Sequence, residues 1–153
     1  KYLQLYVPDS VSEDVLDKIL EEDAGVKQVV ETIKSADILV HGMGQAQVMA
    51  EKRGVDPCII ARLKEEGAVG EALGQYFSLD GRVVYSTDTL GLMVNDLEKI
   101  HTVMGIAGGH SKGPAILSVL RSGKQDILVT DEAAAREIIN CLQMENNHKL
   151  DNI

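Results

Sequence analysis

The segment Gly108-Gly109-His110-Ser111-Lys112 has the residue types of an anion-binding turn. It follows an apolar run that predicts a strand and precedes a helical pattern. Glycines let the backbone approach a ligand closely, and amide groups at a helix start, a hydroxyl and an ammonium group together suit a phosphate. A plain strand–helix turn with Ser111 as the helix cap explains the same residues, and the spacing is not that of a Walker loop.

Two further positions carry charges that suit a sugar phosphate. Glu71 lies among small and apolar residues, where its carboxylate would accept hydrogen bonds from sugar hydroxyls; a solvent-facing residue is the alternative interpretation. Lys52 and Arg53 end a predicted helix, where cations interact favourably with the helix dipole. A second anion contact is the functional interpretation of this pair.

Other patterns favour structural roles. Gly42-Met43-Gly44 follows a strand-like run, but a dinucleotide-binding fingerprint would need a third glycine where Gln47 stands. His41, at the end of that run, is interpreted as a structural histidine. No zinc, redox-dithiol or serine-hydrolase signature occurs in the sequence, so we expect neither a metal nor a cofactor.

Apolar strand-like runs alternate with helical patterns along the chain. This alternation predicts an α/β fold with a mainly parallel, Rossmann-like sheet flanked by helices. Ligands bind at the carboxyl ends of such strands, so we expect the site after Val40, Ala107 and Val129. The expected strands cover residues 2–7, 37–40, 71–78, 82–86, 102–107 and 127–130, and the expected helices cover 10–22, 26–34, 45–52, 57–66, 95–100, 112–121 and 131–142.

Local signals indicate where several elements begin and end. Ser10 and Glu13 have the spacing of a capping box, and Asp131 is placed to cap the last helix. Gly123 is expected just past a helix end, and Leu79-Asp80-Gly81 is expected to connect two strands as a hairpin. The polar residues 144–153 are expected to form a frayed tail.

The composition narrows the class of protein. The 153 residues carry a net charge of −9, which argues against binding of nucleic acid by this polypeptide itself. No apolar run is long enough to span a membrane. Cys58 and Cys141 are too few for a disulfide framework, and a cytoplasmic location is expected.

Taken together, these segments resemble the effector-binding domain of SorC-family bacterial transcription regulators. The order and spacing of the motifs are more specific than any single motif. The resemblance covers residues 36–139 and is carried by Val40–Gly44, Met49-Ala50, Ala68–Phe77, Asp80-Gly81, Gly91–Asp96, Ala107–Gly109, Ser111-Lys112, Ala115-Ile116, Leu128–Glu132 and Ala134.

The resemblance implies a fold similar to that of sugar-phosphate isomerases and deaminases, used as a sensor and not as an enzyme. It implies a phosphorylated sugar as effector, such as fructose 1,6-bisphosphate in the glycolytic branch. The family's ligand contacts fall on Lys112, on Glu71 and on the Lys52-Arg53 pair, with Lys52 at the matching position. Relatives often have Arg there, and a lysine cannot make the bidentate fork to a phosphate.

Whole members of the family carry a DNA-binding domain and a Gly-Gly-Thr-like phosphate loop, and neither occurs in this sequence. We therefore expect residues 1–143 to be the C-terminal portion of a sugar-phosphate effector domain, followed by the tail 144–153. Gly108, Gly109 and Ser111 complete the expected ligand site. The expected partners are a phosphorylated sugar, operator DNA bound through another domain, and further copies of the chain.

Two other functions stay open at this point. The fold would also suit an isomerase- or deaminase-type enzyme, with Glu71 or His41 as the general base. A half-domain that dimerises and binds no ligand is the remaining alternative.

Overall fold

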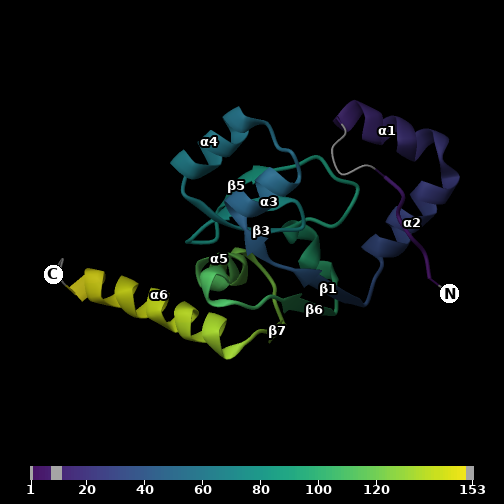
Figure 1. Cartoon of the computed structure of the whole chain (residues 1–153). Helices are drawn as coiled ribbons and strands as arrows, with labels where there is room; N and C mark the ends of the chain where they lie inside the picture. Colours follow the sequence, from purple (N-terminus) through teal and green to yellow (C-terminus); the bar gives the residue numbers. More distant parts are fainter. Residues whose placement is uncertain (1, 8–11, 151–153) are drawn as a thin grey trace.

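Two sheets organise the chain, of which the computed structural model describes residues 2–7 and 12–150 (Figure 1). The strands are β1 (Ile38–Gly42), β2 (Gly44–Gln45), β3 (Ala68–Ala72), β4 (Gln75–Ser78), β5 (Val83–Ser86), β6 (Thr102–Ile106) and β7 (Ile127–Val129). The α-helices are α1 (Glu13–Glu22), α2 (Ala24–Lys34), α3 (Ala46–Lys52), α4 (Pro57–Glu65), α5 (Gly113–Ser122) and α6 (Glu132–Leu150), and the short 3-10 helices are η1 (Val94–Lys99) and η2 (His110–Lys112).

The first sheet has the order β1-β6-β7 and is parallel throughout. The apolar strands pair in register from Ile38 opposite Thr102 to Gly42 opposite Ile106. Its inner face packs into the larger hydrophobic core, which contains Val103, Ile116 and Val119. The predicted α/β fold with a parallel sheet and flanking helices is confirmed.

The second sheet is antiparallel, with the order β2-β3-β4-β5. Helix α5 lies against β3, and the contact is close because Gly70 has no side chain: a β-carbon there would lie 2.7 Å from the Ala115 carbonyl oxygen. The chain enters this sheet directly from β1, since only Met43 separates β1 from β2. The carboxyl end of β1 therefore adjoins the antiparallel sheet.

The predicted strand over residues 71–78 is wrong, because the chain reverses inside it. Leu73 and Gly74 both have positive φ, of 55° and 75°, and they join β3 to β4 as a two-residue hairpin. Such turns favour Asn-Gly or Asp-Gly sequences, so the leucine concealed this one. The reversal brings the Gly74 amide next to Glu71.

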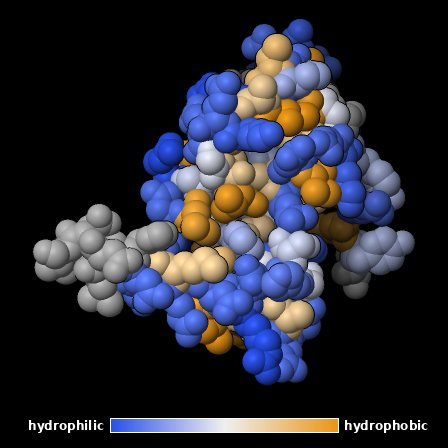
Figure 2. All heavy atoms as spheres, turned by 60° about the vertical axis from the view of Figure 1, so that its left-hand side comes forward, coloured by the Kyte–Doolittle hydropathy of each residue, from blue (hydrophilic) through white to orange (hydrophobic). Residues whose placement is uncertain are grey.

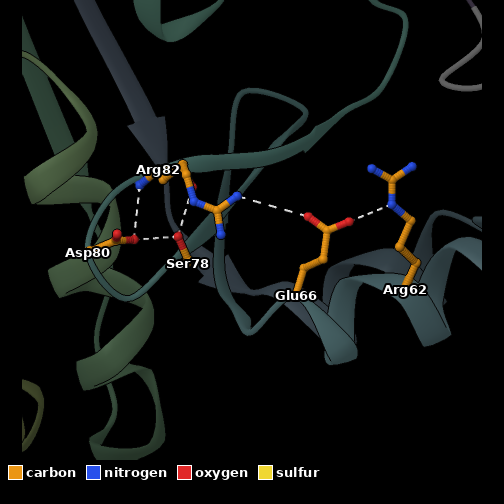
Figure 3. Close-up of polar contacts among 5 residues, drawn as sticks. All are labelled: Arg62, Glu66, Ser78, Asp80 and Arg82. Atoms are coloured by element: carbon orange, nitrogen blue, oxygen red, sulfur yellow. Dashed lines mark hydrogen bonds and ion pairs between the residues drawn. The ribbon is translucent and has the colours of Figure 1, made fainter.

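The second hairpin confirms the expected turn at Leu79-Asp80-Gly81. Ser78 Oγ donates to Asp80 Oδ1 at 2.5 Å, and Gly81 N donates to the Ser78 carbonyl at 2.9 Å. Figure 3 shows this turn beside Arg82, whose guanidinium faces Glu66, itself paired with Arg62 at 2.6 Å. The hydrogen bond from Ser78 lowers the pKa of Asp80.

The outer face of the parallel sheet is open. Ile38 and Val40 of β1 are 62% and 56% exposed, and Ile106, Ile127 and Val129 on the neighbouring strands are exposed as well. In Figure 1 no coloured helix lies below β6, on the side away from α5. Parallel sheets in globular proteins are normally covered on both faces. By contrast, the view in Figure 2 is mainly hydrophilic, with apolar side chains in small separate groups.

The last helix is longer than predicted. α6 continues past Leu142 to Leu150, so the expected frayed tail is helical as far as the structure describes it; residues 151–153 lie outside the described part. Arg121 of α5 holds its distal half: Nη1 and Nη2 contact the two Glu145 carboxylate oxygens at 2.9 and 2.7 Å, and Nη1 also donates to the Leu79 carbonyl at 3.0 Å. One guanidinium thus joins α5, α6 and the second hairpin.

Residues 2–7 do not form the predicted strand, because no other strand in the described chain pairs with them. Gly123 ends α5 with an extended φ of 174°, not in the left-handed conformation of a C′ glycine. Ser10 lies outside the described residues; α1 begins at Glu13, after Ser12. No helix in the described ranges is long and apolar enough to cross a membrane.

Candidate functional site

A pocket of about 440 Å³ lies where β1 passes into β2. Its floor is the segment from β1 to the start of α3, and its walls come from the end of α3, the first hairpin and the turn before α5. The lining residues are His41, Gly42, Met43, Gly44, Gln45, Val48, Met49, Lys52, Arg53, Glu71, Leu73 and Lys112. Four residues predicted as ligand contacts, Lys52, Arg53, Glu71 and Lys112, therefore share one cavity.

Glu71 is the buried carboxylate of this pocket. It lies on β3 and is 3% exposed. Its Oε1 accepts a hydrogen bond from Gly74 N at 2.9 Å and forms an ion pair with Arg53 Nη2 at 3.0 Å. Within the described residues Oε2 has no hydrogen-bond partner. The carboxylate is thus fixed through one oxygen, while the other remains available to a donor.

Two cations come from the end of α3. Its sequence after the glycine turn is rich in helix-forming residues, and it places Lys52 in the last turn and Arg53 at the C-cap. Arg53 is held by Glu71. The Lys52 ammonium forms no ion pair or hydrogen bond with any described residue. An unpaired ammonium at a pocket wall is a ready anion contact.

The third cation comes from the turn after β6. Lys112 ends η2, directly before α5, and lines the pocket without an ion pair to any described side chain. Its backbone N–H donates to the Gly109 carbonyl at 2.9 Å. Gln45 holds the other side of this turn, since its Nε2 donates to the Ser111 carbonyl at 2.8 Å.

Gly108, Gly109 and Ser111 are not among the residues that line the pocket. The Gly109 N–H already donates to Asp131 Oδ2, at 2.6 Å. Asp131 also caps α6 as predicted, since its Oδ1 accepts from Ala134 N at 2.8 Å. The glycine turn is therefore tied to the start of α6.

Both ring nitrogens of His41 lie close to oxygen atoms of the same chain. Nε2 lies 2.9 Å from Gln125 Oε1, and Nδ1 lies 3.1 Å from the Gly42 carbonyl oxygen. The ring is buried beside the pocket. These contacts fit the structural histidine expected from the sequence.

A second pocket, of about 280 Å³, lies on the other side of Arg53 and Leu73. It is lined by Leu5, Val7, Leu16, Arg53, Leu73, Gly74 and residues 87–92. Of the residues predicted to contact ligand it contains only Arg53, so the first pocket is the candidate site. Sequence reasoning did not single out Gln45 and Leu73, because a short strand and a concealed turn give no recognisable motif.

The candidate site is cationic on an acidic protein. Lys52, Arg53 and Lys112 face one carboxylate, Glu71, which leaves two positive charges in excess, although the whole chain carries −9. Such a site suits a dianion that also carries hydroxyl groups for Glu71.

In the described residues no group of three or more His, Cys, Asp or Glu side chains is placed to hold a metal ion. Fold and pocket thus define an α/β domain with a cationic pocket of a shape and charge that suit a small anionic ligand.

Comparison with known proteins gives the family. The family model described as "Putative sugar-binding domain" matches residues 1–140, and the chain belongs to this family. The "Central glycolytic genes regulator" of Bacillus subtilis is 38% identical over 138 residues, which are 90% of this chain and 40% of the relative. The chain thus spans less than half the length of this relative.

Solved structures agree with this membership. A crystal structure described as that of a SorC-family transcriptional regulator from Enterococcus faecalis is 37% identical, with a TM-score of 0.81 over 88% of this chain and 55% of that one. The sugar-binding domain of a transcriptional repressor from Vibrio fischeri is 27% identical, with a TM-score of 0.71 over 92% of this chain and 58% of that one. The resemblance to SorC-family effector domains is thereby confirmed.

Proposed function

We propose that this chain is the effector-sensing part of a cytoplasmic DNA-binding transcription regulator, a repressor of sugar metabolism, and that it binds a phosphorylated sugar such as fructose 1,6-bisphosphate. The observation that carries the proposal is the pocket that Arg53 and a buried glutamate share with two lysines, neither of which pairs with a described side chain. The cations suit a phosphate, and the free oxygen of Glu71 suits a sugar hydroxyl. Operator DNA is bound through another domain, and the regulator works as a homo-oligomer.

The sensing role is favoured over catalysis because the proteins that this chain resembles are described as transcription regulators. Glu71 Oε1 takes two donors, and its Oε2 is the oxygen that an isomerase-type reaction would need as the base that takes a proton from carbon. Incubation with sugar phosphates in deuterium oxide separates the two functions, because a sensor leaves the carbon-bound hydrogens unexchanged and an isomerase exchanges them.

The binding proposal is tested by calorimetric titration with fructose 1,6-bisphosphate, with fructose as the unphosphorylated control. At a hundred times its dissociation constant, a ligand adds about 2.7 kcal/mol to the free energy of unfolding, which a thermal melt detects. Absence of any stabilisation by hexose or triose phosphates would contradict the proposal.

Two lysine variants assign the phosphate contact. Lys112→Ala should weaken binding about tenfold or more, since a hydrogen bond to a charged group is lost. Lys52→Arg should strengthen binding, because the guanidinium restores the bidentate fork. Lys64→Ala is the matched control, since Lys64 is exposed on α4 and outside the pocket. Equal affinity in all four proteins would refute the assignment of the pocket.

A further inference from the structure

A negative charge from outside the turn that carries Lys112 contacts its backbone. Asp131 Oδ2 accepts the Gly109 N–H at 2.6 Å, although a turn of this sequence is expected to present its amides to an anion. A carboxylate in this position would repel a phosphate. The structure therefore leaves the ammonium of Lys112, and not the Gly109 amide, as the turn's contact with an anion.

Both glycines of the turn serve this carboxylate. A β-carbon on Gly108 would lie 2.6 Å from Asp131 Oδ2, so only glycine leaves room for it. Gly109 has a φ of 101°, a conformation that side chains disfavour, and this conformation accompanies the N–H bond to Asp131. The glycine pair is explained by Asp131 without any ligand.

The same carboxylate makes a second, separable contact. Its Oδ1 accepts from Ala134 N at 2.8 Å and so caps α6. The turn also packs on α6 farther along: a β-carbon on Gly113 would lie 2.5 Å from Glu137 Cγ, and His110 Nδ1 lies 3.5 Å from Glu137 Oε2. The first turns of α6 thus form the support on which the lysine turn rests.

The position of Gly109 is passed on to Lys112 through the backbone, because Lys112 N donates to the Gly109 carbonyl. We propose that Asp131 is a positioning residue of the effector site, which fixes the Gly108-Gly109 turn so that the Lys112 ammonium faces the pocket. This inference rests on the proposed function for its ligand. It assigns Asp131 a role beyond capping the helix.

The two contacts of Asp131 can be separated by substitution. Asp131→Ser retains a side-chain oxygen that caps α6 nearly as well as aspartate. Its shorter side chain offers one oxygen where two bonds are now accepted, so the bond to Gly109 is lost. Asp131→Ala removes both contacts. A residue that only caps the helix would be replaced by serine without consequence.

The first measurement is the affinity of the full-length protein for fructose 1,6-bisphosphate. We expect Asp131→Ser to unfold at nearly the wild-type temperature and to bind about tenfold more weakly, as for the loss of one charge-assisted hydrogen bond. Gly108→Ala should weaken binding in the same way. Wild-type affinity in Asp131→Ser would overturn the proposal, and so would tighter binding, which would show that Asp131 competes with the ligand.

The second measurement needs no ligand. In the apo protein, amide hydrogen exchange over residues 109–112 should be faster in Asp131→Ser than in the wild type, while the first turn of α6 exchanges as before. Unchanged exchange in the turn would overturn the positioning role even in a protein that binds no sugar phosphate. If the wild type itself binds none of these ligands, the proposed function fails, and the exchange result decides the role of Asp131 separately.

Discussion

Replacing Glu71 by alanine should destabilise the fold as well as remove the proposed ligand contact. The side chain is 3% exposed, and its Oε1 is the acceptor for Gly74 N and for Arg53. The bond from Gly74 to a charged acceptor contributes about 1.5–3 kcal/mol. The ion pair adds about 0–1 kcal/mol, because Arg53 is 30% exposed and recovers water when its partner is removed.

The expected total for Glu71→Ala is a loss of about 3 kcal/mol in the free energy of unfolding. For a chain of this length, that loss lowers the melting temperature by about 6–12 °C. Glu71→Gln keeps an acceptor for Gly74 N and loses only the charge, so its loss should be about 1 kcal/mol. The two variants should therefore differ from each other by about 2 kcal/mol in the free energy of unfolding.

Urea denaturation followed by circular dichroism measures these losses, since the chain has no tryptophan for fluorescence. Glu98→Ala is the control: Glu98 is exposed on η1, and its change should stay within about 0.5 kcal/mol. If Glu71→Ala unfolds within that same range, Glu71 does not hold the first hairpin, and the reasoning from its contacts is refuted.

Two further predictions concern the core and the open sheet face. Tyr76 is fully buried, and its hydroxyl has no hydrogen-bond partner in the described residues, so Tyr76→Phe should raise the free energy of unfolding by about 1 kcal/mol. Burial, followed by the charge of Glu71, raises the pKa of Tyr76. Because the folded state disfavours the ionised phenol, the wild type should lose stability as the pH rises from the ordinary tyrosine pKa through the raised pKa of the folded state. The Tyr76→Phe variant lacks this loss, so parallel losses of stability in wild type and variant in urea titrations at alkaline pH would contradict the prediction. The 153-residue chain alone should self-associate through the exposed apolar face of the parallel sheet, which includes Val40. Val40→Lys should reduce this association, whereas the control Ile139→Lys on α6 should not. A monomeric wild-type chain in light scattering would refute the role of that face.

Sequence patterns predicted the parallel sheet because apolar strands and amphipathic helices alternate with clear boundaries. They failed over residues 71–78, where Leu73 has a positive φ and begins a hairpin turn. Leucine is not a residue type that predicts such a turn. They also failed at residues 2–7, which have strand propensity but pair with no strand that the structure describes. Strand propensity depends on the local sequence, whereas a strand forms only where a neighbouring strand accepts and donates its backbone hydrogen bonds.

The candidate site could be predicted in its charged residues but not in its internal contacts. The resemblance to SorC-family effector domains implies one ligand site for Glu71, Lys112 and the Lys52-Arg53 pair, and the structure places all four in one pocket. The pairing of Arg53 with Glu71, and of Gly109 with Asp131, depends on how the two sheets and α6 pack. Such contacts join residues 18 or more positions apart, and a single sequence carries no signal for them.

The Arg121 fork decides where this polypeptide can be shortened. Cutting the chain at residue 143 would keep most of α6 but remove Glu145, the carboxylate that both guanidinium nitrogens contact. Among the described residues, Arg121 would keep its hydrogen bond to the Leu79 carbonyl, and the half-buried guanidinium would lose its ion-pair partner. The turn of α6 that carries Glu145, polar as it is, therefore contributes to the packing of α5 and the second hairpin.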